Sequence, residues 1–336
     1  METRLFGPDA VTALASVDAV VDAVESAVAA AARDRAVMPA KSYVDLPAHE
    51  GDFRSMPAYL DVRPGDGPGD DSWEAAAVKW VNVHPNNPTH YDLPTVMGTV
   101  IYADPETGAP LALLDGTTLT RLRTGAAAAV ATKYLAREDA TSLGLVGAGR
   151  QADAQLAAIA TVRDIERVVI SDIDAGAIAA FRDRIDDRFD VREGSVAAAA
   201  ACDVVSTVTP VTEPIVDAVG ERTHVNAIGA DASGKHEITD DVLRSARIVI
   251  DDYEQCVHSG EINVPFASGT LTDADLDGEL GDVVIGAVPG RQPDDGVTVF
   301  DSTGLAIQDV AAARVVYDRA GGTPVGDSYE LVDATP

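Results

Sequence analysis

The sequence predicts an α/β protein of two domains, one with a parallel sheet and one with a mainly antiparallel sheet. The chain has 336 residues, of which 46% are apolar, and this length exceeds what one hydrophobic core usually organises. Extended segments joined by turns dominate up to about residue 115, which is typical of an antiparallel sheet. Beyond about residue 120, strand and helix patterns alternate, and this favours a parallel sheet covered by helices on both faces.

The N-terminal part contains one clear helix and several strands. Ser16 is a favourable N-cap for a helix whose valines within Val17–Val28 fall on one face. Apolar and polar residues alternate over Val78–Val83, as in a half-buried strand. Thr99–Ala103 and Leu111–Leu114 are strand-like, and the turn between them predicts a hairpin.

The second part alternates short apolar strands with helices. Ser142–Val146 precedes a helix over Gln151–Thr161, and Val168–Ser171 precedes a helix over Ala175–Arg184. Further strands are expected near Val204–Thr207, Val225–Ile228, Ile248–Ile250 and Val297–Phe300, and the last leads into a helix from Gly304 to about Arg319. This order predicts a parallel sheet.

The chain is strongly acidic, with 55 acidic and 25 basic residues and a formal net charge of −30. Such a surface repels nucleic-acid phosphates, so nucleic-acid binding is disfavoured. The acids are spread through folded-looking segments, and lysine is scarce, occurring only at Lys41, Lys79, Lys133 and Lys235. We therefore expect adaptation to concentrated salt, in which counterions screen the self-repulsion.

Composition also bears on location and metals. No apolar run reaches the ~18 residues of a membrane span, and the N-terminus lacks the basic and apolar regions of a secretory signal. Cys202 and Cys256 form neither a disulfide framework nor a metal pattern, and the histidines show no ligand spacing. We expect a cytoplasmic protein without membrane contact or catalytic metal.

A glycine-rich motif lies between the first strand of the alternating part and the helix that follows it. Gly147, Gly149 and Ala152 fit the pattern G-x-G-x-x-A. Gly147 permits a tight turn, Gly149 lets the backbone approach a pyrophosphate, and Ala152 lets helix and strand pack closely. The helix N-terminus offers free N–H groups to the anion, so the motif predicts a dinucleotide-binding domain of the Rossmann type.

Asp172 follows the second strand of this domain, where an acidic residue accepts hydrogen bonds from the adenosine ribose. A carboxylate there repels a 2′-phosphate, no arginine follows immediately, and Asp174 adds negative charge. The expected cofactor is therefore NAD rather than NADP.

Several further segments follow one another in order. They are Asp52–Leu60 (DFRSMPAYL), Lys79–Asn82 (KWVN) with His84-Pro85, Leu93–Met97 (LPTVM), Leu122–Ala127 (LRTGAA), Asn226–Asp231 (NAIGAD) through Gly234-Lys235, Gly260–Val264 (GEINV) and Phe300–Asp309 (FDSTGLAIQD). With the glycine motif they extend over about residues 38 to 320. Together they resemble the ornithine cyclodeaminase/mu-crystallin family, most of all its archaeal alanine dehydrogenase branch.

The resemblance implies an organisation and a partner. Residues 1–120, completed by 304–336, would form a substrate-binding and dimerisation domain, and residues 121–303 the Rossmann domain. The implied partner is a second copy of the chain, in a homodimer.

The resemblance also implies functional residues. Arg54 matches the position that binds the substrate α-carboxylate, which suits a guanidinium fork. Lys79 matches the lysine at the substrate, and burial near Arg54 should lower its pKa and make it a usable acid or base. Asp231 matches an aspartate near the nicotinamide, and Lys235 a cofactor-contacting lysine. The remaining matches line the cofactor: Thr95, Arg123, Arg150, Gln151, Thr207, Val225, Asn226, Ala227, Ile228 and Thr303.

The reaction implied by this branch is reversible NAD-dependent oxidative deamination of L-alanine to pyruvate and ammonia. Hydride would pass between Cα and the nicotinamide, with Lys79 and Asp231 handling protons.

Three alternatives remain open. Ornithine cyclodeamination needs an acid for the δ-ammonium group. The candidates lie in or beside the acidic segment Pro64–Asp71, which we expect to be a flexible loop: Asp61, Asp66, Asp70, Asp71 and Glu74. A ketimine or imine reductase is the second. The third is a non-catalytic NAD(P)-dependent binding protein resembling mu-crystallin, which the presence of Arg54 and Lys79 disfavours.

Overall fold

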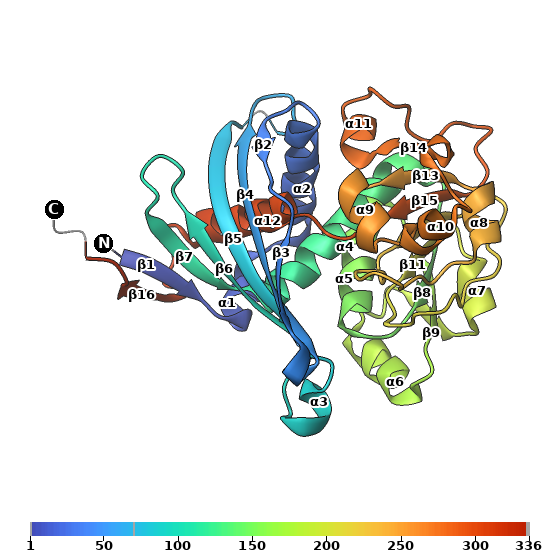
Figure 1. The fold of residues 1–336 in the computed structure, drawn as a ribbon, viewed down its shortest axis with the longest axis horizontal. Coiled ribbons are helices and arrows are strands. Elements are labelled where there is room, and N and C mark those ends of the chain that lie inside the picture. The colour runs from blue at the N-terminus through green and yellow to red at the C-terminus, as the bar shows by residue number, and fades with distance from the viewer. Residues whose placement is uncertain (1, 70, 334–336) are drawn as a thin grey trace. The chain divides into compact units, whose positions relative to one another are not determined.

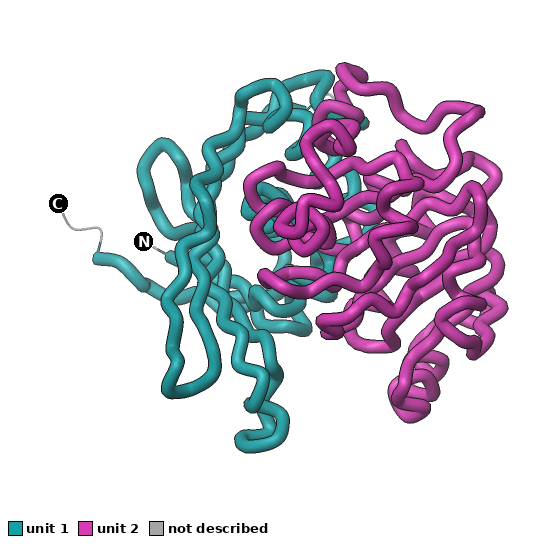
Figure 2. Tube along the Cα trace, turned by 45° about the vertical axis from the view of Figure 1, so that its right-hand side comes forward, with its two compact units in different colours: residues 1–123, 305–336 teal, residues 124–304 magenta. Residues whose placement is uncertain are grey.

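The computed structural model describes residues 2–69 and 71–333, and the chain divides into two compact units. Unit 1 comprises Met1–Arg123 and Leu305–Pro336, and unit 2 comprises Thr124–Gly304 (Figure 2). The first division falls at Arg123, inside helix α4 (Gly116–Leu135), rather than at residue 120. Because α4 is continuous across the division, helical periodicity alone does not locate it.

Unit 1 is built on a sheet of eight strands among the described residues. The strand order is β16-β1-β7-β6-β5-β4-β2, with β3 paired to β4. All pairings are antiparallel except that of β1 with β7. The strands are β1 (Glu2–Phe6), β2 (Ala36–Val37), β3 (Ser42–Leu46), β4 (Gly51–Val62), β5 (Trp73–Val83), β6 (Val96–Ala103), β7 (Pro110–Asp115) and β16 (Asp327–Glu330).

One face of this sheet, here called the inner face, is covered by helices. Met56 and Leu60 of β4 pair with Lys79 and Ala75 of β5, and all four are at most 5% exposed. Helix α12 packs against β4, β5 and β6, and α2 packs against β4 and α12 (Figure 1). The helices of the unit are α1 (Pro8–Leu14), α2 (Val17–Ala31), α3 (Asn87–His90), α12 (Ala306–Ala320) and the 3₁₀ turn Pro47–His49.

The opposite, outer face carries the alternate side chains of the same strands. Trp80 pairs with Thr99 and Val78 with Ile101 across β5 and β6. Trp80 is 45% and Ile101 39% exposed. The outer face therefore presents apolar side chains that the helices on the inner face do not cover.

Unit 2 is an eight-stranded, all-parallel sheet within the described residues. The strand order is β10-β9-β8-β11-β12-β15-β13-β14, so the chain reverses direction across the sheet after β10. The strands are β8 (Ser142–Val146), β9 (Arg167–Ser171), β10 (Asp190–Glu193), β11 (Val204–Thr207), β12 (His224–Ala227), β13 (Arg247–Ile250), β14 (Leu276–Glu279) and β15 (Thr298–Asp301). Ligands of such sheets bind beyond the carboxyl ends of the strands at this switch point, which here lies beside β8.

Helices connect these strands. They are α5 (Arg150–Val162), α6 (Ala175–Arg184), α7 (Val196–Ala200), α8 (Asp240–Ser245), α9 (Tyr253–Ser259), α10 (Asn263–Ser268), α11 (Leu280–Val284) and the 3₁₀ turn Asp273–Asp275. Small and branched side chains fill the core, among them Leu143, Ile170, Val205 and Val299, each fully buried. The predicted fold class, a Rossmann-type parallel-sheet domain with an α+β domain, is confirmed.

The segment Pro64–Asp71, which the sequence predicts to be a flexible loop, is held in place at Asp66. Asp66, within the segment expected to be flexible, is only 3% exposed. Its carboxylate forms ion pairs with Arg33 and Arg35 and accepts a hydrogen bond from the backbone N–H of Arg63 at 2.7 Å. Asp66 therefore anchors the segment, while Asp70 lies outside the described residues. None of the helices in residues 2–69 and 71–333 is both long and apolar enough to cross a membrane.

Candidate active-site residues in the two units

The glycine-rich loop of unit 2 has the shape that an anion-binding turn requires. Gly147 has φ +105°, and a Cβ there would lie 2.9 Å from the Val208 carbonyl oxygen. Gly149 is the N-cap of α5, and a Cβ there would meet nothing within 4 Å. The first glycine is thus needed by the fold itself, whereas the second keeps open space at the helix N-terminus. Such a terminus attracts a phosphate group.

Asp172 lies directly after β9 and is held against this loop. Its carboxylate accepts hydrogen bonds from the N–H of Ala148 at 2.6 Å and from the N–H of Asp174 at 2.9 Å. The structure therefore brings together the glycine loop and the acid that the sequence assigns to the ribose. Beside them, Gln151 of α5 has a buried Oε1 with no hydrogen-bond partner among the described residues, and Arg150 is exposed. These groups fit a dinucleotide.

The strand positions assigned to the cofactor are buried. Thr207 of β11 and Val225, Asn226 and Ala227 of β12 are fully inaccessible, while Ile228 and Thr303 are partly exposed. The Asn226 amide donates to Thr132 Oγ1 at 3.0 Å and faces His224 Nε2 at 3.1 Å. Burial lowers the pKa of His224 to about 3, so its ring is neutral. The Asn226 side chain is therefore hydrogen-bonded within the core of unit 2, and its role at the cofactor stays a prediction.

Asp231 and Lys235 form an ion pair in the loop that follows β12. Lys235 Nζ lies 2.7 Å from Asp231 Oδ1 and donates to the Gly229 carbonyl at 2.9 Å. Asn263 fastens the far end of this loop, since its amide donates to the Lys235 carbonyl at 2.7 Å and its Oδ1 accepts from the Gly234 N–H at 2.8 Å. Asp231, predicted to lie near the nicotinamide, and Lys235, predicted to contact the cofactor, thus occupy one hydrogen-bonded loop at the carboxyl edge of the sheet.

Lys79 lies on the inner face of the unit 1 sheet and is 2% exposed. Its Nζ is 2.7 Å from Asp309 Oδ2 and 3.3 Å from Thr120 Oγ1. Asp309 stands in the first turn of α12, is 1% exposed, and also receives Arg123 Nε on Oδ1 at 3.1 Å. Arg123 additionally donates to Gln308 Oε1 at 3.1 Å. Lys79, Arg123 and Asp309 therefore form a buried group of two cations and one anion, here called the triad.

Two members of the triad add to the expected site. Arg123, whose assignment to the cofactor by resemblance stays a prediction, is 6% exposed and shares Asp309 with Lys79. Asp309 was not among the expected site residues. Its signal in the sequence is an acidic residue inside an apolar helical run, which indicates a paired, buried carboxylate.

Burial lowers the pKa of Lys79 to about 7, because the ammonium form loses its hydration. The Asp309 carboxylate opposes this shift, and the nearby charges of Arg123 and Lys41 add to it. The expected direction is confirmed, but the cationic contribution comes from Arg123 and Lys41 rather than from Arg54. Lys79 can therefore gain or lose a proton near neutrality.

Arg54 shares the inner face with Lys79. It pairs with Val81 of β5, two residues along the strand from Lys79, so the two backbones are roughly 7–8 Å apart. Its guanidinium holds the Asp52 carboxylate, with Nε–Oδ1 at 2.9 Å and Nη2–Oδ2 at 3.1 Å. Arg54 thus already binds a carboxylate through two nitrogens. Thr95 lies farther along, just before β6, where its carbonyl accepts from the His84 N–H.

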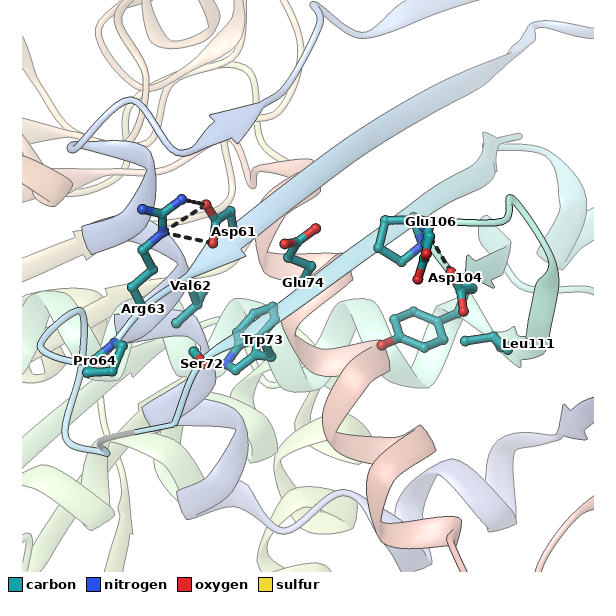
Figure 3. A pocket seen from close by; sticks show the side chains of 12 residues that line it. Asp61, Val62, Arg63, Pro64, Ser72, Trp73, Glu74, Asp104, Glu106 and Leu111 are labelled. Atoms are coloured by element: carbon teal, nitrogen blue, oxygen red, sulfur yellow. Dashed lines mark hydrogen bonds and ion pairs between the residues drawn. The ribbon is translucent and has the colours of Figure 1, made fainter.

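A hollow of about 700 Å³ lies at the other end of this sheet (Figure 3). Asp61, Glu74, Asp104 and Glu106 are among the residues that line it, and Arg63 turns onto Asp61. Asp61 pairs with Glu74 on the outer face, whereas Lys79 is on the inner face, five residues farther along β5. Asp61 and Glu74, two of the five acids considered for a second substrate amine, are therefore on the opposite side of the sheet from Lys79.

Comparison with known proteins places this fold and these residues in a family. The sequence profile of the ornithine cyclodeaminase/mu-crystallin family matches residues 2–323. An alanine dehydrogenase of Archaeoglobus fulgidus is 44% identical over 334 residues, covering 98% of this chain and 99% of that protein. A delta(1)-pyrroline-2-carboxylate reductase of Bacillus cereus is 35% identical and an L-lysine cyclodeaminase of Streptomyces rapamycinicus 37% identical, each over 77% of this chain and over 81% and 76% of their own lengths.

Comparison with solved structures supports the same family. An archaeal alanine dehydrogenase dimer with bound NAD superposes with a TM-score of 0.91 and 43% identity, over 99% of this chain and 100% of that one. The chain belongs to the ornithine cyclodeaminase/mu-crystallin family.

Proposed function

We propose that the chain is an NAD-dependent L-alanine dehydrogenase that interconverts L-alanine and water with pyruvate and ammonia. The observation that carries the proposal is the buried triad of Lys79, Arg123 and Asp309, with Arg54 on the same sheet face. This arrangement suits a small amino acid, because it combines carboxylate-binding cations with a lysine that titrates near neutrality. The full-length similarity to an alanine dehydrogenase supports the choice of substrate.

NAD fits unit 2. The free N–H groups at the start of α5 suit the pyrophosphate, and Asp172 suits the ribose hydroxyls while disfavouring a 2′-phosphate. When bound there, NAD would supply the hydride acceptor for oxidation of the substrate Cα and, as NADH, the hydride donor for the reverse reaction.

The chain's own residues orient the substrate and move protons. Arg54 and Arg123 hold the α-carboxylate and so fix Cα in position. The α-ammonium group must lose a proton before Cα can release hydride, and Lys79 Nζ accepts it in the neutral form. The Asp231 carboxylate then takes a proton from the water that attacks the imine carbon. Each role is of the kind that a positioned side chain performs within hydrogen-bond reach.

The runner-up is a cyclodeaminase, which the similarity to an L-lysine cyclodeaminase favours. That reaction needs an acid near the second amine of the substrate. Asp61 and Glu74 point from the outer face, and Asp66 is buried in its own ion pairs. Asp61, Glu74 and Asp66 therefore do not meet the requirement, which favours a small monoamine substrate.

The test is a set of three assays with purified protein in concentrated KCl. We expect NADH oxidation that depends on both pyruvate and ammonium. Proline formed from ornithine without net NADH would favour the cyclodeaminase, and NADH oxidation with delta(1)-pyrroline-2-carboxylate but not pyruvate would favour an imine reductase. Lys79→Ala should abolish turnover, whereas Lys133→Ala, which alters an exposed lysine beside Tyr134, should not.

We also infer that two copies associate through the outer face of unit 1. Its exposed apolar side chains, including Trp80 and Ile101, are the kind that subunit contacts bury, and the related archaeal enzyme is a dimer. Sedimentation in concentrated KCl should give the mass of two chains.

The free, buried Cys202 and Cys256 accord with a reducing cytoplasm. The net charge of −30 accords with a cytoplasm rich in salt.

A further inference from the structure

Three fully buried carboxylates follow one another at the carboxyl edge of the unit 2 sheet. Asp301 ends β15, Glu261 follows α9, and Glu237 follows the loop after β12. Each is 0% exposed. Buried acids are costly unless hydrogen bonds compensate for the lost hydration, so their partners indicate what they hold in place.

The first two carboxylates each accept hydrogen bonds from backbone N–H groups of the segment that carries the next one. Asp301 accepts from the N–H of Glu261 at 2.8 Å and of Ile262 at 3.1 Å. Glu261 Oε1 accepts from the N–H of Glu237 at 2.8 Å and of Ile238 at 2.6 Å. The position of the Glu237 backbone is therefore set by a chain of hydrogen bonds that begins on a core strand.

Glu237 in turn joins two loops. Its Oε1 accepts from the N–H of Thr209 at 2.8 Å and from Thr209 Oγ1 at 2.6 Å, in the loop after β11. Its Oε2 accepts from the N–H of Gly229 at 3.0 Å, in the loop after β12. A Cβ at Gly229 would lie 2.4 Å from Glu237 Oε2, so the backbone approaches the carboxylate as closely as only glycine allows.

The loop held by Glu237 is the one that carries Asp231 and Lys235. Gly229 is fixed from both sides, because Glu237 takes its N–H and Lys235 Nζ donates to its carbonyl. Lys235 Nζ also pairs with Asp231 Oδ1. A displacement of Gly229 would therefore move the carbonyl that accepts a hydrogen bond from Lys235. Lys235 would move with it and so displace the Asp231 carboxylate with which it pairs.

We propose that Glu237 is a positioning residue that fixes residues 229–235 and thereby orients Asp231 and Lys235. The inference rests on the proposed function for its kinetic consequence, but its structural consequence stands without it. Glutamine at position 237 keeps the shape of the side chain and loses one of its two acceptor oxygens. One of the two loops must then lose its hydrogen bond.

The experiment compares Glu237→Gln with the unaltered protein in concentrated KCl. Without any ligand, amide hydrogen exchange of a peptide covering residues 229–237 should rise about tenfold or more, as expected when a local hydrogen bond worth about 1.4 kcal/mol is lost. In turnover, kcat for L-alanine should fall roughly tenfold to a hundredfold with little change in KM, because misplaced groups slow the chemical step. The isotope effect on kcat with 2-deuterated alanine should rise for the same reason.

Asp203→Asn is the matched control. Asp203 accepts from the N–H groups of Thr141 and Ser142 at 3.1 Å each and from Ser142 Oγ at 2.7 Å, at the opposite edge of the same sheet. It should lower thermal stability without changing exchange in 229–237 or kcat. Should Glu237→Gln fail to fold, Thr209→Val removes only the hydroxyl hydrogen bond and should raise exchange in the same peptide to a smaller extent.

The outcomes separate the two proposals. Unchanged exchange over 229–237, or an equal rise throughout unit 2, would overturn the positioning role. Absence of alanine turnover in the unaltered protein, with exchange still raised locally in Glu237→Gln, would overturn the proposed substrate and leave the positioning role supported.

Discussion

Replacing Asp309 with asparagine should shift the pH dependence of L-alanine oxidation toward acid. In the proposed mechanism the neutral form of Lys79 is the active one in this direction, so kcat/KM should rise with pH through the Lys79 pKa of about 7. The Asp309 carboxylate, 2.7 Å from Nζ, stabilises the ammonium form. Its removal therefore favours the neutral amine, and the ionisation moves to lower pH.

The size of the shift follows from the distance. Two unit charges 2.7 Å apart attract by about 6 kcal/mol at an effective dielectric constant of about 20. Arg123 competes for the same carboxylate, and the asparagine oxygen keeps part of the hydrogen bond, so the net effect is smaller. Opposite charges at such distances shift pKa values by about 1–3 units. We therefore expect the rising limb of the plot of kcat/KM against pH to move to lower pH by that amount.

The assay is kcat/KM for L-alanine between pH 5 and pH 9 in concentrated KCl, with circular dichroism at each pH to verify folding. Asp318→Asn is the control, because Asp318 lies on the same helix, is half-exposed and pairs with Arg314. It should leave the limb in place. A limb in Asp309→Asn that stays near pH 7 or moves to higher pH would refute the assignment of the ionisation to the triad.

Four further variants have expected outcomes. Gly149→Val should fold normally but weaken NAD binding at least about tenfold, as measured by NADH fluorescence. The valine side chain would fill the open space that the backbone needs for its close approach to the pyrophosphate. Gly147→Val should instead lower Tm, since φ +105° and the nearby Val208 carbonyl oxygen exclude a side chain at that position. Asp172→Ser should raise the ratio of NADP to NAD in kcat/KM by roughly tenfold or more by removing the repulsion of a 2′-phosphate; an unchanged ratio would count against the ribose assignment. Ile101→Glu should shift sedimentation from two chains to one, and persistence of the larger species would place the contact elsewhere.

The regular parts of the fold follow from local patterns. The helix capped by Ser16 begins at Val17, and its side chain accepts from the Ala19 N–H as an N-cap should. The terminal strands were not predictable in the same way. β16 (Asp327–Glu330) is exposed throughout, and β1 (Glu2–Phe6) owes its place to parallel pairing with β7. A strand with no alternating burial leaves no period in the sequence, because a distant partner determines it.

The candidate site likewise contains residues that local sequence patterns predict and residues that only distant packing brings together. Lys79 stands out because a lysine within an alternating apolar strand is unusual, and it is indeed buried. Its partner Asp309 is 230 positions away in the chain and becomes visible only when α12 packs on the inner face. The resemblance assigned Arg123 to the cofactor, and this assignment stays a prediction; the buried partners that the structure shows for it are Asp309 and Gln308. Pairings between remote elements depend on the register and packing of the whole unit, which no local pattern contains.

The charge of the triad links substrate binding to the protonation of Lys79. With Lys79 protonated, the triad of two cations and one carboxylate has a net charge of +1, and with Lys79 neutral it has none. A substrate α-carboxylate held beside it would favour the protonated form and raise the Lys79 pKa. The ionisation seen in kcat should therefore lie at higher pH than the one seen in kcat/KM, since the first reports the bound state and the second the free enzyme. Alanine, lysine and pyrroline-2-carboxylate all carry a carboxylate next to the carbon that bears nitrogen, so this linkage suits every substrate named among the relatives. Under the proposed function, the triad would serve what those reactions share, and the choice between them would come from residues around the rest of the substrate.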